Sequence, residues 1–235
     1  MPVASSKFKF ELSGYYFTGL IGLVLLGFWP SYFSKFFDGS GRFSFYFHFH
    51  AAVVGLWILL LIIQPLLIRK RKMALHRFLG KLSYGLFPLL FVSILLLAHS
   101  RIQGLKGDLG LNLFVPFKDL LIIGVAYYIA IRYRYTVDIH ARGMVATGLV
   151  CIEPALSRLL YNTTHLVPFY YLATIAVIYI LLIVLIIRER KQPVGRWVFP
   201  LILGLYAIVH AIILFQIRIG PWELFCKWFA SLPIT

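Results

Sequence analysis

Ionisable side chains inside the most apolar stretches are the residues of this sequence that could carry chemistry. They belong to five apolar runs, and counting along each run places them in the same half of the predicted membrane. An ionisable group in hydrocarbon is costly and usually faces a protein interior or a wet cavity. The set comprises His48, His50, His99, Arg101, Asp119, Glu153, Arg158 and His210. Because the opposite half has little beyond Gln64, the pattern predicts one functional region near one face of a helical bundle.

Imidazoles and a carboxylate from different helices could bind a metal ion or a haem. His50, His99 and His210 are the candidate ligands, and Asp119 is a candidate fourth ligand or a partner that orients an imidazole. Zinc, copper or iron would suit this donor set. Two of the histidines could instead hold a b-type haem, with Arg101 or Arg158 near the propionates. The first hypothesis is therefore a metal- or haem-binding membrane protein for redox chemistry or cofactor handling.

The same residues allow three other functions. Asp119, Glu153 and Arg158 could line the outward-facing polar pocket of a transporter or receptor. A zinc-bound water could serve an intramembrane hydrolase, although the last apolar run has only His210 where seven-helix hydrolases have a histidine pair. Lys118 with Asp119, and Glu153 with Arg158, could be structural ion pairs in a subunit of a larger membrane complex. No HxxxH, HExxH, Walker or GxGxxG motif selects among these functions, and no catalytic residue is assigned.

The elements that position these residues follow from composition. Of 235 residues, 61% are hydrophobic and 13% are charged, whereas soluble domains are nearer 25% charged. About 20 apolar residues in a helix cross the hydrocarbon core of roughly 30 Å. We therefore predict an all-α, single-domain membrane bundle over residues 1–235, with about seven transmembrane helices. The predicted helices lie near residues 14–33, 44–68, 83–100, 112–132, 143–161, 167–187 and 197–217.

Basic residues gather in the segments between alternate helices and set the predicted orientation. Segment 69–82 holds Arg69, Lys70, Arg71, Lys72, Arg77 and Lys81 without any acidic residue. Segments 132–143 and 188–196 are also basic, and Lys7 and Lys9 precede the first apolar run. With seven helices all of these lie on one side, so the N-terminus is expected in the cytoplasm and the C-terminus outside. The net charge of +15 thus indicates anionic lipid headgroups, and not nucleic acid, as the partner.

Part of the sequence resembles a family of bacterial predicted membrane proteins of unknown function. The resemblance is carried by His50, Trp57, Gln64-Pro65, Leu75-His76-Arg77 and Leu79-Gly80-Lys81, and by the segment from His140 through Pro154 to Arg158. The family pattern is a histidine in the second helix, a Gln-Pro near its inner end, and then His-Arg-x-x-Gly. The resemblance covers about half of the chain and implies a multi-pass protein of the bacterial cytoplasmic membrane with no established activity.

Overall fold

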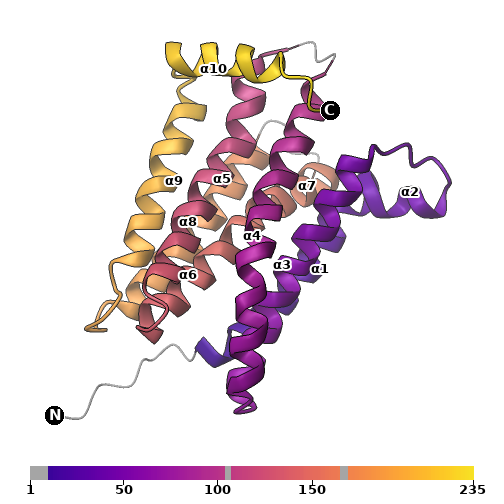
Figure 1. Ribbon diagram of the computed structural model, residues 1–235. Helices are drawn as coiled ribbons and strands as arrows, with labels where there is room; N and C mark the ends of the chain where they lie inside the picture. Colours follow the sequence, from indigo (N-terminus) through magenta and orange to yellow (C-terminus); the bar gives the residue numbers. More distant parts are fainter. Residues whose placement is uncertain (1–9, 104–106, 165–168) are drawn as a thin grey trace.

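The apolar runs form helices because hydrocarbon offers backbone N–H and C=O groups no water, so they must bond within each segment. The computed structural model describes residues 10–103, 107–164 and 169–235, which contain no strand. The helices are α1 (Ser13–Phe28), α2 (Ser34–Phe37), α3 (Phe45–Arg69), α4 (Met73–Ile102), α5 (Leu109–Arg132), α6 (Val137–Val150), α7 (Ile152–Thr164), α8 (Tyr170–Glu189), α9 (Val198–Leu214) and α10 (Gly220–Ala230). The predicted all-α polytopic bundle is confirmed (Figure 1).

Six helical segments are long and apolar enough to cross a membrane. They are Ser13–Phe37, Phe45–Arg69, Met73–Ile102, Leu109–Arg132, Val137–Thr164 and Tyr170–Glu189. The first of them joins α1 to α2 through a π-helical turn at Trp29–Phe33. Helix α9 has 17 residues, the lower end of the usual range for a transmembrane helix, and it runs along the bundle beside α5 and α8 (Figure 1). The prediction of about seven helices therefore corresponds to six long segments and one short one.

The two ends of the bundle differ in chemistry. One end, here called the basic end, carries the loops 70–72, 133–136 and 190–197. The six basic residues predicted for segment 69–82 are all exposed at this end, while Lys7 and Lys9 lie outside the described residues. At the other end α10 lies across the bundle (Figure 1), and we call this the α10 end. The sequence reading treated the chain after residue 217 as a tail and missed this helix.

Lipid-facing and buried surfaces are both apolar, as expected for a membrane protein. Large side chains point outward along the helices, for example Leu26 at 61% and Ile208 at 61% exposure. Inside, the rings of Trp57, Phe87 and Tyr127 form an aromatic centre between α3, α4 and α5, and the Phe87 and Tyr127 centroids are 3.8 Å apart. This aromatic centre separates the polar groups near the α10 end from those near the basic end.

The fifth apolar run is broken between α6 and α7. Pro154 has no N–H to donate to the carbonyl of Val150, and its ring crowds that carbonyl. The helix is interrupted at Cys151. The N–H of Cys151 bonds to the carbonyl of Gly148, three residues back, at 3.1 Å. Sequence analysis predicted one continuous helix near 143–161. The break places Glu153 in the first turn of α7, inside the bundle.

Helices α5 and α6 pack closely because a glycine lies at their contact. A Cβ atom added at Gly143 would lie 2.8 Å from the Ala130 nitrogen and 2.9 Å from the Ala126 oxygen. A larger residue would therefore push the two helices apart. This contact holds α6 against α5. It thereby also fixes the position of the break at Cys151, which follows α6.

Candidate functional site

A buried ion network from four helices lies between the middle of the bundle and the α10 end. The Lys118 ammonium on α5 is 2.7 Å from Asp119 Oδ1 and 2.7 Å from Glu153 Oε1 on α7. The Lys118 side chain has no exposed surface, and the Glu153 side chain is 4% exposed. The predicted pair of Lys118 with Asp119 is therefore present. Its extension to Glu153 brings residues 35 positions apart in sequence into contact, which spacing alone could not indicate.

His210 on α9 continues this network. Its Nε2 lies 3.4 Å from Glu153 Oε2, and its Nδ1 lies 3.3 Å from the hydroxyl oxygen of Tyr179 on α8. Glu153 thus has one oxygen toward an ammonium and the other toward an imidazole. We call Lys118, Asp119, Glu153, His210 and Tyr179 the ion network.

Three tyrosine rings surround the imidazole of His210. The ring centroids of Tyr206, Tyr179 and Tyr171 lie 5.3, 5.7 and 6.1 Å from that of His210. The hydroxyl groups of Tyr171 and Tyr206 are buried and have no hydrogen-bond partner among the described residues. Because an unpaired buried hydroxyl is costly, these two groups mark a place where a polar ligand or water would be stabilised.

The charges in direct contact within the ion network do not balance while His210 is neutral. Lys118 supplies one positive charge against the two carboxylates of Asp119 and Glu153. Arg158 interacts with Asp119 only at longer range, and Cys151 is another neighbour of that carboxylate. One proton on the Glu153–His210 link would neutralise the contacting groups. Glu153 also lies in the first turn of α7, where the helix dipole favours a negative charge.

Arg158 has a different partner from the one predicted. Its Nη1 donates to the Pro154 carbonyl at 2.9 Å, and its guanidinium lies 4.5 Å from the Phe28 ring centroid. The expected pairing of Glu153 with Arg158 is wrong, because Glu153 turns toward α5 and α9. His50, on α3, is a neighbour of Arg158 and hydrogen-bonds through Nδ1 to Ser93 on α4 at 3.1 Å.

The other predicted site residues lie in separate surroundings. His48 Nδ1 is 2.7 Å from the Tyr32 hydroxyl, within a group of aromatic rings beside α2. His99 is buried beneath α10, where Nδ1 is 2.5 Å from Thr235 Oγ1 and the Phe229 ring packs edge-on. Arg101, two residues further on, is exposed.

The proposed ligands His50, His99 and His210 are therefore not brought together. Each contacts its own set of side chains, and only His210 lies against a carboxylate. In the part of the chain that the structure describes, no group of three or more His, Cys, Asp or Glu side chains is arranged to hold a metal ion. Asp119 shares the ion network with His210 but pairs with Lys118, an ammonium that repels a metal cation.

Sequence analysis also missed polar groups in the half of the bundle near the basic end. Arg142 belongs to the basic segment 132–143, which was predicted between two helices, but it is fully buried and pairs with Glu189 at the end of α8. Its Nη1 also donates to the Asp138 carbonyl at 2.7 Å, and a Cβ at Gly195 would lie 2.9 Å from that nitrogen. Gln64, which sequence analysis did place in this half, has both amide atoms buried without a partner among the described residues.

The fold and the ion network define the class of this chain as a multi-pass α-helical membrane protein with ionisable groups buried between its helices. In comparisons with protein-family models, with curated proteins and with solved structures, no match to this chain was found. Its function is therefore argued from the geometry of the ion network.

Proposed function

We propose that this protein is a proton-coupled transporter of the bacterial cytoplasmic membrane, in which Glu153 and His210 carry the proton. The observation that supports this proposal is that one buried carboxylate, Glu153, lies between an ammonium and an imidazole from two other helices. Ionisable groups buried in this way in membrane proteins commonly mark ion and proton pathways. The transported solute would be a small polar or charged molecule, since the hydroxyl groups of the neighbouring Tyr171 and Tyr206 have no hydrogen-bond partner among the described residues.

The hydrogen bonds of His210 differ between its neutral and its protonated form. When the imidazole is neutral, the Tyr179 hydroxyl donates to Nδ1 and Nε2–H donates to Glu153. When it is protonated, both ring nitrogens donate, and Tyr179 must rotate its hydroxyl to accept. Proton uptake thus changes the hydrogen bonds of α8 and α9 and strengthens the link between α9 and α7. Such a change is what couples a proton to helix movement.

The broken helix supports this proposal independently. In many transporters, discontinuous membrane helices carry the binding site, and the half-helix ends contribute partial charges to it. Here the break at Cys151 lies two residues before Glu153. A change in the charge of Glu153 would therefore exert its force beside the break, where α7 can most easily move relative to α6. The aromatic centre of Trp57, Phe87 and Tyr127 would form the barrier toward the basic end.

Infrared difference spectroscopy of the purified protein in lipid nanodiscs tests proton binding without knowledge of the solute. When the pH is lowered stepwise from alkaline to acidic values, the wild-type protein should gain one proton in the ion network. Glu153→Gln should abolish the carboxyl or imidazole signal, whereas Glu223→Gln on α10, outside the ion network, should leave it unchanged. A wild-type spectrum without any such signal would overturn the proposal.

Proton flux into liposomes gives a second measurement. A potassium diffusion potential, with a pH-sensitive dye inside, should drive proton entry for the wild type and for Glu223→Gln, and at least tenfold less for Glu153→Gln. If Glu153→Gln supports wild-type flux while folding normally, Glu153 does not carry the proton.

A further inference from the structure

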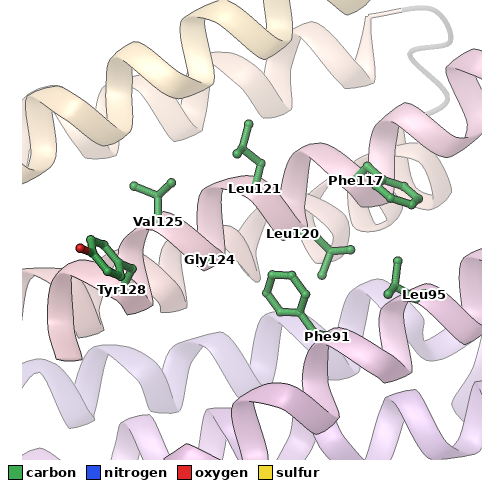
Figure 2. Close-up of a pocket in the computed structure, with 8 residues that line it drawn as sticks. All are labelled: Phe91, Leu95, Phe117, Leu120, Leu121, Gly124, Val125 and Tyr128. Carbon is green, nitrogen blue, oxygen red and sulfur yellow. The ribbon is translucent and has the colours of Figure 1, made fainter. Parts of the chain in front are cut away.

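An apolar groove lies between α4 and α5, on the lipid-facing side of the bundle. Basic side chains lie beyond one of its ends. Its volume is about 520 Å³, and its walls include Phe91 and Leu95 on α4 and Leu121 and Val125 on α5. Gly124 forms the floor opposite Phe91, as Figure 2 shows. A Cβ atom at Gly124 would already lie 3.2 Å from the Phe91 ring, so the glycine keeps the groove deep.

The groove has the length of one leaflet. It extends along α5 from Phe117 to Tyr128, which lie at its two ends (Figure 2). Eleven residues of helix rise about 16 Å, and half of the hydrocarbon core measures about 15 Å. An extended acyl chain could therefore lie along the groove over a length close to that of one leaflet.

The same helix faces carry tyrosines and then cations toward the basic end. On α5 the face that bears Leu121 and Val125 continues to Tyr128 and Arg132, at spacings of three and four residues. On α4 the face that bears Phe91 continues in the opposite chain direction to Tyr84 and Lys81. Both basic residues are exposed, and Tyr84 also interacts electrostatically with Arg134 beyond the end of α5. Each helix thus presents an apolar stripe, an interfacial tyrosine and a cation in matching order.

We propose that this groove binds one phospholipid of the surrounding bilayer, with an anionic headgroup. Its acyl chain would lie over Gly124 between Phe91 and Leu121, and its phosphate would meet Lys81 and Arg132. Charge complementarity selects this occupant over a second copy of the chain, because each copy carries cations at this end and two copies would repel. The tyrosines fit the interfacial depth at which a phospholipid changes from hydrocarbon to headgroup. This proposal does not depend on proton coupling.

Native mass spectrometry of protein extracted from nanodiscs tests the site. The nanodiscs contain phosphatidylglycerol and phosphatidylethanolamine in equal parts, and the ratio of the two lipids retained on the protein is measured. The wild type should retain phosphatidylglycerol preferentially. The double variant Lys81→Gln/Arg132→Gln should lower that ratio about 30-fold, since each basic residue near the surface contributes about 1 kcal/mol. The matched control is Arg190→Gln/Lys191→Gln, two exposed residues in the loop between α8 and α9, and it should behave as the wild type.

A second variant tests the hydrocarbon part. Gly124→Leu fills the groove and should reduce the retention of both lipids several-fold. Gly204→Leu on α9, where an added Cβ meets nothing within 4 Å, should not. The proposal is overturned if the wild type shows no preference for phosphatidylglycerol, if the two charge variants give equal ratios, or if Gly124→Leu retains lipid like Gly204→Leu. It is also overturned if the wild type is a dimer that Gly124→Leu dissociates, because a second copy would then occupy the groove.

Discussion

At the scale of single residues, Lys118 determines whether two carboxylates can remain ionised inside the bundle. It contacts both Asp119 and Glu153 at 2.7 Å and has no exposed surface. Taking two carboxylates out of water is costly, and a shared ammonium offsets that cost only while it is present. The sequence showed the adjacent Lys118 and Asp119, but their common partner became visible only when α7 was placed beside α5.

Replacement of this lysine should destabilise the protein strongly. Lys118→Met leaves the carboxylates of Asp119 and Glu153 without an ammonium, with only His210 still in contact with Glu153. We expect a loss of about 3–5 kcal/mol in the free energy of unfolding. Thermal unfolding in detergent, followed by tryptophan fluorescence, measures the effect. The double variant Lys118→Met/Glu153→Gln should be more stable than Lys118→Met alone, because one unpaired charge has been removed. Lys227→Met, on the exposed face of α10, is the control; equal stability of Lys118→Met and this control would contradict the role assigned to Lys118.

At the scale of elements, α10 is held against the bundle by a mixture of apolar and ionic contacts. Phe229 and Cys226 pack against Leu113 and Ala98, and the Trp222 indole donates to the Gly110 carbonyl at 3.0 Å. Arg218, just before α10, lies 2.6 Å from Asp108, the N-cap of α5. Because Thr235 then reaches His99, the docked end of the chain also closes a buried imidazole from solvent.

The docking of α10 should weaken in acid. The Leu111 backbone N–H, and then Arg218, hold the pKa of Asp108 below its ordinary value of 3.8. A carboxyl with a lowered folded-state pKa contributes stability above the unfolded value, and that contribution is lost as the pH falls through the folded value. The loss is therefore expected below about pH 4.

Labelling of buried Cys226 by a pyridyl disulfide measures this opening. In a Cys151→Ser background the labelling rate should rise as the pH falls below about 4. Asp108→Ala should raise it already at pH 6, by up to about fivefold, since it removes the ion pair with Arg218 and an exposed pair contributes up to about 1 kcal/mol. Asp38→Ala removes an exposed acid in the loop between α2 and α3, away from Arg218, and should leave the labelling rate unchanged. A rate independent of both pH and Asp108 would show that apolar packing alone holds α10.

At the scale of the whole molecule, the distribution of positive charge predicts the direction of insertion. The basic end holds the loops with exposed lysines and arginines, and the chain ends at the opposite, α10 end. Alkaline phosphatase is active only where its disulfides form, outside the bacterial cytoplasm. A fusion after Thr235 should therefore be active, and a fusion after Lys72 should be inactive. The reverse pattern would place the basic end outside and would contradict the predicted orientation.

The sequence alone determined that this protein is a helical membrane bundle, and it also located Asp119, Glu153 and His210 inside that bundle. Hydrophobic run length is a local property, so the helices and the depth of Glu153 and His210 could be predicted without tertiary information. Which side chains meet depends on how each helix is rotated and packed against its neighbours. That packing separated His50, His99 and His210, joined Glu153 to Lys118 in place of Arg158, and buried Arg142 beside Glu189. Only the tertiary structure could decide these partners, because contacts between distant segments leave no periodic signal in the chain.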